Sequence, residues 1–272
     1  MQKTLTLAVM SGKGGVGKTN ITLNAALALT RLGQRVLVMD GDLGLANIDV
    51  LLGCSPEHSL QDVLTGGLAP EEAITEARPG LDLLPAASGA DELVTLTSES
   101  ARTLADSLTP ALGSYDFVLL DLGAGIGGNV VELARLVRRR VVVTTPEPTA
   151  LTDSYALIKV MHRMLGTESF SYIVNNVMDP EETDFTRERL EGACSHFLGF
   201  APDYIGSVRQ DPVLSAAVMS QVPLLEFAPD SPAAADIAAA AKLLLSQKND
   251  ILRGAAAPFL TEEECADPTA DA

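Results

Sequence analysis

The residues with the clearest chemical character in this chain form a glycine-rich loop near the N-terminus. The loop reads Gly12-Lys13-Gly14-Gly15-Val16-Gly17-Lys18-Thr19-Asn20, and Gly12 with Gly17-Lys18-Thr19 fits the spacing G-x-x-x-x-G-K-[ST]. Glycine backbones can direct successive N–H groups at one anion, and the helix N-terminus behind them favours negative charge. The loop therefore predicts a cradle for phosphate groups. Lys18 would reach the β- and γ-phosphates, and the Thr19 hydroxyl would bind Mg²⁺.

The segments on either side of the loop agree with this interpretation. The apolar run from Leu5 to Met10 predicts a buried strand before it, and Ile21 to Leu32 predicts a helix after it. A strand, a glycine loop and a helix in this order are the structural context that the phosphate-binding motif requires. The alternative is a glycine-rich turn that only connects a core strand to a core helix.

Acidic residues stand at the ends of two other predicted strands. The segment from Arg35 to Asp40 leads into Asp40-Gly41-Asp42, and the apolar segment Tyr115 to Leu120 ends at Asp121. Ligands of open α/β sheets bind at the carboxyl ends of the strands. Two carboxylates beside a phosphate loop suit a Mg²⁺ shell and the activation of water, and Asp121 would hold that shell. The alternatives are a turn at Asp-Gly-Asp and a helix-capping role for Asp121.

A second lysine, Lys13, extends the loop motif to K-G-G-x-G-K-[ST], which resembles the deviant Walker A motif of the MinD/ParA (SIMIBI) ATPases. The resemblance runs from about Thr4 to Ala241. It implies an α/β fold with ATP and Mg²⁺ bound in a homodimer, where Lys13 crosses to the partner's phosphates. It also implies that Asp40 supports Mg²⁺ through water and that Asp42 orients the attacking water. A solvated loop lysine is the alternative for Lys13.

The same resemblance assigns roles to residues at two other strand ends. Gly125, in Leu122-Gly123-Ala124-Gly125-Ile126 after Asp121, would give a backbone N–H to the γ-phosphate. Asn175, at the end of the predicted strand Ser169 to Asn175, would contact adenine, because an amide can match the adenine N6 and N1 edge. A turn asparagine is the competing interpretation for Asn175.

Four stretches resemble one branch of the family, the flagellar-number regulators called FlhG or FleN. They are residues 12–20, 40–53, 121–126 and 147–159. The branch implies an ATP-switched regulator of flagellar number or placement, with an FlhF-like GTPase, flagellar switch-ring proteins or a transcriptional regulator as partners. The alternative is a ParA/MinD-type ATPase that positions another cargo or the division or chromosome machinery. The chain departs from the family at Leu122, where Thr is usual.

The fold expected from these elements is a single α/β P-loop domain over residues 1–253. The resemblance implies a mostly parallel sheet of about seven to eight strands with helices on both faces. Residues 254–272 are acidic and are expected to form a disordered tail after a closing helix from Asp236 to Arg253. An anionic tail is repelled by anionic lipid, which disfavours a membrane anchor there.

The run Arg138-Arg139-Arg140 is expected to complement a helix C-terminus and remain solvated, or else to dock an acidic partner.

Charge and cysteine content restrict the function further. The chain of 272 residues has a formal net charge of −17, which disfavours nonspecific DNA binding because that requires clustered Lys and Arg. Three dispersed cysteines, Cys54, Cys194 and Cys265, predict reduced structural residues rather than a metal cluster.

No apolar run has the length of a membrane span. With a strand expected directly after Met1-Gln2-Lys3 we expect no cleavable leader and a cytoplasmic location, at the cell pole or inner membrane surface through partners.

Overall fold

The computed structural model describes residues 4–43, 47–86, 95–253, 255, 257–261 and 264. Its strands are β1 (Leu5–Met10), β2 (Val36–Gly41), β3 (Thr75–Arg78), β4 (Leu81–Leu84), β5 (Phe117–Leu122), β6 (Arg139–Thr144), β7 (Phe170–Val177) and β8 (Asp203–Arg209). They form one sheet of 8 strands in the order β3-β4-β2-β5-β1-β6-β7-β8. β3 pairs antiparallel with β4, and every other neighbouring pair is parallel. The α/β fold with a mostly parallel sheet is therefore as predicted.

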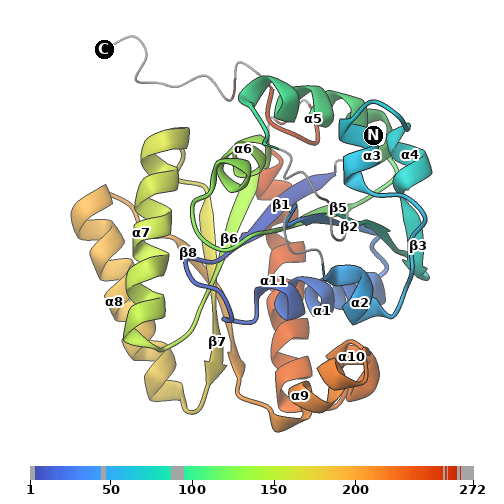
Figure 1. The fold of residues 1–272 in the computed structure, drawn as a ribbon. Coiled ribbons are helices and arrows are strands. Elements are labelled where there is room, and N and C mark those ends of the chain that lie inside the picture. The colour runs from blue at the N-terminus through green and yellow to red at the C-terminus, as the bar shows by residue number, and fades with distance from the viewer. Residues whose placement is uncertain are drawn as a thin grey trace, which may run out of the picture.

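The helices cover both faces of this sheet (Figure 1). They are α1 (Lys18–Arg31), α2 (Ile48–Leu52), α3 (Leu60–Leu64), α4 (Pro70–Ala73), α5 (Ser98–Leu112), α6 (Gly128–Leu136), α7 (Pro148–Leu165), α8 (Pro180–Leu198), α9 (Pro212–Met219), α10 (Leu224–Phe227) and α11 (Pro232–Ile251). α5, α6, α7 and α8 pack against one face, and α1, α10 and α11 pack against the other. None of the helices in the described part of the chain is both long and apolar enough to cross a membrane.

The central strands are apolar on both faces because helices cover them on both sides. In β1, Leu5, Leu7 and Val9 point into the core beneath α1 and α11, whereas Ala8 and Met10 point into the core beneath α5 to α8. This alternation is the two-residue period of a strand. It places β1 in the middle of the sheet between β5 and β6, so that the loop after β1 lies at the centre of the carboxyl edge.

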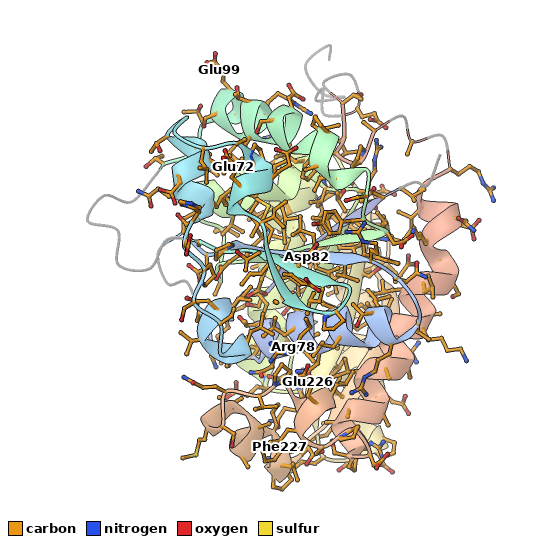
Figure 2. The ribbon with its side chains drawn as sticks, turned by 90° about the vertical axis from the view of Figure 1, so that its right-hand side faces the viewer. Glu72, Arg78, Asp82, Glu99, Glu226 and Phe227 are labelled. Carbon is orange, nitrogen blue, oxygen red and sulfur yellow. The ribbon has the colours of Figure 1, made fainter. Side chains whose placement is uncertain are left out.

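The edge strand β3 is short and only partly buried. Figure 2 shows this edge of the sheet, where Arg78 of β3 lies close to Glu226 of α10. Arg78 Nε and Glu226 Oε1 are 2.8 Å apart. This ion pair connects the edge of the sheet to the helices that follow β8.

The C-terminal part of the chain differs from the expected disordered tail over residues 254–272. Phe259 is buried, the Thr6 hydroxyl donates to the Pro258 carbonyl at 2.8 Å, and the Leu260 N–H donates to the carbonyl of Leu136 at 2.8 Å. The prediction of a tail from residue 254 is thus wrong for 257–261, because an apolar side chain and backbone groups dock on the domain. Residues 254, 256, 262–263 and 265–272 of the predicted tail lie outside the described residues.

The three consecutive arginines are not solvated as predicted. Arg138 and Arg140 are buried, and Arg139 pairs with Asp203, with 2.7 Å between Nη2 and Oδ2. Arg140 does complement the end of α6, since its Nε donates to the carbonyl of Ala134 at 2.9 Å. Because β6 begins at Arg139, this run enters the sheet, where carbonyl and carboxylate acceptors can satisfy buried guanidinium groups.

Candidate functional site

The glycine-rich loop from Ser11 to Gly17 connects β1 to α1, as the sequence predicts. Gly15 and Gly17 have φ angles of 81° and 89°, in the left-handed region that favours glycine. Among the residues that the structure describes, and apart from the chain neighbours, none would lie within 4 Å of a β-carbon placed on Gly14 or Gly15. The backbone is therefore open on this side, as close approach of a phosphate group requires.

Two other glycines of the loop are needed because neighbouring elements pack directly on them. A β-carbon on Gly12 would lie 2.3 Å from the backbone oxygen of Asp153 in α7, and one on Gly17 would lie 2.3 Å from Nδ2 of Asn175. Both distances are far below van der Waals contact. The loop is thus held between α7 on one side and the end of β7 on the other.

Lys18, Thr19 and Asp121 meet at the start of α1. Lys18 Nζ lies 3.0 Å from Asp121 Oδ2, and the Thr19 hydroxyl donates to the same oxygen at 2.7 Å. The side chain of Asp121 is 2% exposed. The structure therefore brings Lys18, Thr19 and the acidic residue of β5 together. Their roles toward phosphate and magnesium stay predictions.

Sequence reasoning missed Thr22, which completes the surroundings of Asp121. Its hydroxyl donates to Asp121 Oδ1 at 2.7 Å, and the Thr22 side chain is fully buried. Asp121 thus accepts a hydrogen bond at each oxygen, one from Thr19 and one from Thr22. The sequence did contain a signal for this contact, because Thr19 and Thr22 are three positions apart and residues at that spacing share one face of a helix.

Asp40 lies beside Asp121 at the carboxyl edge, since the two residues are partners in the β2–β5 register. Its Oδ1 accepts from the Asp42 N–H at 3.0 Å and its Oδ2 from the Asn47 N–H at 3.2 Å. Burial, with a smaller contribution from the Asp121 carboxylate, raises the pKa of Asp40 to about 7 although these hydrogen bonds act in the opposite direction. Asp40 therefore supports the loop after β2 through backbone contacts.

This set of donors fits a magnesium ion that arrives with a nucleotide. Two neighbouring buried carboxylates repel each other, and a divalent cation would offset that repulsion. Mg²⁺ commonly takes one or two carboxylates and completes its shell with water and phosphate oxygens. Within the described part of the chain no three His, Cys, Asp or Glu side chains could hold a metal by themselves. Thr19 and Asp121, with Asp40 behind them, match a site in which the protein supplies a few of the magnesium ligands and the nucleotide and water supply the others.

Asp42 lies where the loop after β2 approaches the loop after β5. A β-carbon placed on Gly123 would be 3.5 Å from the carboxyl carbon of Asp42. The carboxyl group is therefore next to the segment that follows Asp121, on the same edge of the sheet as Lys18. Its role toward water stays a prediction.

Gly125 has a φ angle of 84°, and its N–H donates to the Ser11 carbonyl at 2.8 Å. This bond joins the loop after β5 to the beginning of the phosphate-binding loop. The expected contact of the Gly125 N–H with a γ-phosphate would have to replace it. That contact stays a prediction.

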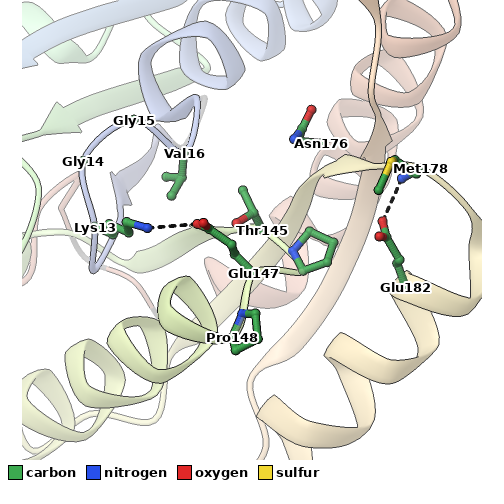
Figure 3. A pocket seen from close by; sticks show the side chains of 11 residues that line it. Lys13, Gly14, Gly15, Val16, Thr145, Glu147, Pro148, Asn176, Met178 and Glu182 are labelled. Carbon is green, nitrogen blue, oxygen red and sulfur yellow. Dashed lines mark hydrogen bonds and ion pairs between the residues drawn. The ribbon is translucent and has the colours of Figure 1, made fainter.

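Lys13 stands on the rim of the loop and is held by the start of α7 (Figure 3). Its Nζ is 2.9 Å from Glu147 Oε2 and 3.2 Å from Thr149 Oγ1, and its side chain is 40% exposed. Within its own chain Lys13 therefore pairs with the start of α7, whereas Lys18 pairs with Asp121. Sequence reasoning did not identify Glu147 or Thr149 as its partners.

A cavity of about 570 Å³ opens beside the loop, between the ends of β6 and β7 (Figure 3). It is lined by Gly14 to Val16, by Thr145 to Pro148 and by Asn176. Its size is within the range of small-molecule sites, which is about 300–1,000 Å³. Because it continues from the glycine loop, it is the space into which the nucleoside part of a bound nucleotide can extend.

Asn175 itself does not line this cavity. Its side chain is buried, and its Nδ2 donates to the Val16 carbonyl at 2.8 Å. The next residue, Asn176, is exposed, has a φ angle of 61° and lines the cavity. Asn175 thus holds the phosphate loop, and its expected contact with adenine stays a prediction.

The remaining predicted residues lie within the same unit. Val16 is buried and presents its carbonyl to Asn175, and the Asn20 carbonyl accepts from the side chain of Asn24 inside α1. All of the predicted site residues therefore gather at the carboxyl edge of the sheet, with Lys13 at their rim.

Comparison with known proteins agrees with this geometry. The model of the ParA family, described as NUBPL iron-transfer P-loop NTPase, matches residues 2–245. The antiactivator FleN of Pseudomonas aeruginosa is 37% identical over 233 residues, which cover 86% of this chain and 83% of that protein. The flagellum site-determining protein YlxH of Helicobacter pylori is 35% identical over 242 residues, covering 89% and 82%.

A solved structure extends the similarity to the fold. The septum site-determining protein MinD from Pyrococcus horikoshii, complexed with Mg-ADP, superposes with a TM-score of 0.78 at 26% identity. The superposition covers 91% of this chain and 98% of that one. The similarity therefore extends over most of the fold.

Proposed function

Because this chain belongs to the ParA/MinD family of P-loop ATPases, we propose that it is an ATP-dependent dimerisation switch that regulates flagellar number or placement. The observation that carries the proposal is the intact phosphate loop, with Lys13 on its rim, in a chain at least 35% identical to FleN and YlxH over most of their lengths. YlxH is named as a flagellum site-determining protein, and FleN is named as an antiactivator. The family makes the chain an ATPase, and the flagellar role is the proposed part.

In this proposal the loop and α1 bind the triphosphate. Backbone N–H groups of the glycine loop and Lys18 hold the phosphate oxygens. Magnesium held by Thr19 and Asp121, with Asp40 in support, supplies neutralisation of the phosphate charge. On binding, Lys18 and Thr19 exchange their contacts with Asp121 for the ligand.

Hydrolysis requires a residue that orients water beside the phosphate. Asp42 is at the carboxyl edge next to Gly123, and a carboxylate can accept a proton from water and hold its orientation. We assign that role to Asp42. Fixed donors in the loop and Lys18 stabilise the charge that develops during the transfer.

The switch depends on Lys13. In the single chain Lys13 is paired with Glu147 and is partly exposed at the mouth of the cavity. Leaving Glu147, it can reach across an interface to phosphates bound by a second copy. Pairing of two copies then depends on the triphosphate, and hydrolysis reverses it.

Iron transfer, which appears in the description of the family model, is not assigned to this chain. Cys194 is buried in α8, and Cys54 follows α2 on another part of the fold. Cys265 lies outside the described residues. Two such separated cysteines do not form the paired thiolates that a shared cluster needs.

The biochemical test uses light scattering after size exclusion with ATP, ADP or no nucleotide. Wild type is expected to form dimers with ATP and monomers with ADP. Asp42→Ala should keep the ATP-dependent dimer and lose phosphate release, whereas Lys13→Ala should bind ATP and remain monomeric. Wild-type protein that binds ATP but stays monomeric in every condition would refute the switch.

The cellular test separates the flagellar role from the ATPase. Cells without the gene should show an altered number or position of flagella by electron microscopy. Wild-type protein should restore the pattern and Lys13→Ala should not. Normal flagella in the deleted strain, together with a defect in division or chromosome segregation, would favour the alternative of another cargo.

A further inference from the structure

Beyond Asp40 and Asp121, the strands β2 and β5 each continue for one residue, Gly41 and Leu122. These two residues are partners in the β2–β5 register, one step after the pair of acidic residues. Because side chains alternate between the two faces of a sheet, Leu122 lies on the opposite face from the two carboxylates. It is fully buried in the core beneath α5 to α8. Leu122 is therefore close behind the candidate site without being one of its ligands.

Leu122 fills the space in which a side chain at position 41 would stand. A β-carbon placed on Gly41 would lie 2.6 Å from Cδ2 of Leu122 and 3.2 Å from Cδ1 of Leu133 in α6. The first distance is far below van der Waals contact between two carbon atoms. The φ angle of Gly41 is not in the left-handed region, so the backbone itself does not require glycine here. Glycine is required because the Leu122 side chain lies across it.

This contact bears on how closely two loops of the site approach each other. Asp42 follows Gly41, and Gly123 follows Leu122. A β-carbon placed on Gly123 would lie 3.5 Å from the carboxyl carbon of Asp42, which is ordinary van der Waals contact. Protein interiors are close-packed and transmit small displacements. The side chain that separates the two strand ends therefore determines where Asp42 stands relative to the loop after β5.

We propose that Leu122 is a positioning residue for ATP hydrolysis. Packed on Gly41 and against Leu133, it sets the spacing of the ends of β2 and β5 and thereby the place from which Asp42 orients water. The inference rests on the role of Asp42 in the proposed function. A misplacement of about 1 Å can lower the rate of a reaction about a hundredfold. Nucleotide binding uses the loop after β1, so a change at Leu122 lowers the rate of hydrolysis and not the affinity.

The test measures kcat and KM for ATP from phosphate release at saturating Mg²⁺, and the Kd for Mg-ADP by calorimetry, on the full chain. Leu122→Val removes the Cδ2 atom that lies over Gly41. Leu120→Val is the matched control, because it makes the same change two residues earlier on the same buried face, where the β2 partner is Met39. Leu122→Ile, which keeps the volume of the side chain, replaces Leu122→Val if that protein does not fold.

Leu122→Val should lower kcat about tenfold and leave KM and the Kd for Mg-ADP within about twofold of wild type. Leu120→Val should keep the kcat of wild type. A residue with only a structural role would lower stability in both variants and kcat in neither. Equal kcat in Leu122→Val and Leu120→Val would therefore overturn the inference.

A size exchange between positions 41 and 122 tests the spacing directly. Gly41→Ala alone should lower kcat by at least about tenfold, because its methyl group collides with Leu122. Combined with Leu122→Val, it should recover to within about threefold of wild type, since the new methyl group takes the vacated space, whereas Leu120→Val should give no recovery. Absence of recovery in the combined variant would overturn the inference.

Asp42→Ala in the same assay separates this inference from the proposed function. Loss of turnover in Asp42→Ala with unchanged kcat in Leu122→Val would overturn the role of Leu122 alone. Wild-type turnover in Asp42→Ala would overturn the assignment of Asp42 and the role of Leu122 together.

Discussion

Replacing Thr22 by valine tests whether Asp121 depends on the second hydroxyl of α1. Valine keeps the branched shape of threonine but cannot donate a hydrogen bond. The Thr22 hydroxyl is fully buried and donates to Asp121 Oδ1 at 2.7 Å. Asp121 is itself buried. Its Oδ1 would therefore lose this donor with little chance of water taking its place.

The expected loss follows from the charge of the acceptor. A hydrogen bond to an ionised group contributes about 1.5–3 kcal/mol. We expect Thr22→Val to lower the free energy of unfolding by about that amount in nucleotide-free protein. The carboxylate would also be less well oriented for magnesium, so half-maximal ATP turnover should require at least about threefold more Mg²⁺. Thr22→Ser should restore most of both properties.

Urea unfolding and the Mg²⁺ dependence of phosphate release measure the two effects. Thr30→Val is the matched control, because Thr30 lies in the same helix and its hydroxyl donates to a backbone carbonyl, that of Leu27, and not to a carboxylate of the described residues. It should cost less than about 1 kcal/mol and leave the Mg²⁺ dependence unchanged. A Thr22→Val protein as stable as wild type, with wild-type Mg²⁺ dependence, would contradict the assigned role.

Three other substitutions follow from contacts at the same edge. Glu147→Gln weakens a partly exposed ion pair worth about 0.2–1 kcal/mol, so the released Lys13 should give ATP-dependent dimers at up to about fivefold lower protein concentration in light scattering. Gly12→Ala collides with the α7 backbone and should lower unfolding stability by about 1–3 kcal/mol, whereas Gly14→Ala, with open space around it, should differ little in calorimetry. Asp40→Asn tests the raised pKa of about 7. Without magnesium, the free energy of unfolding of wild type should fall relative to that of the variant as pH rises from about 4 to about 7, by about 1.4 kcal/mol per pH unit. A difference in urea unfolding that does not change with pH would refute this.

The phosphate site could be predicted because each part of it is a short local pattern at the end of a strand. Lys18 and Thr19 begin α1 after the glycine loop that follows β1, and Asp40 and Asp121 are the next-to-last residues of β2 and β5. Once those strands are parallel neighbours, their carboxyl ends must meet. The fold class followed from the same alternation of apolar strands and helices.

The orientation of the two asparagines near the end of β7 could not be predicted. Strand periodicity assigns alternate residues to opposite faces, but the β7–β8 register shifts between Asn175 and Val177, and Asn176 adopts a positive φ. That irregularity turns Asn175 toward the phosphate loop and leaves Asn176 at the cavity. Helix α8 was also missed, because few of its residues are buried and its apolar positions show no clear helical period.

The burial of the arginines and of the C-terminal segment depends on partners far apart in the sequence. Arg138 contacts the carbonyl of Phe259, and Thr6 contacts that of Pro258. Nothing in the local sequence of residues 138–140 indicates these acceptors. Composition alone favours solvent for such a run, and only the tertiary fold provides the carbonyl groups that make its burial affordable.

The central position of β1 has a consequence for how the protein is made. Leu5 is paired with Phe117, and Leu7 with Arg139, so the first strand to leave the ribosome must wait for more than a hundred further residues before either neighbour exists. The nucleotide cradle at its tip cannot be assembled during that interval. Newly synthesised chains are thus unable to use ATP as a folding aid until most of the polypeptide has emerged, and an exposed apolar strand has to be protected from aggregation in the meantime.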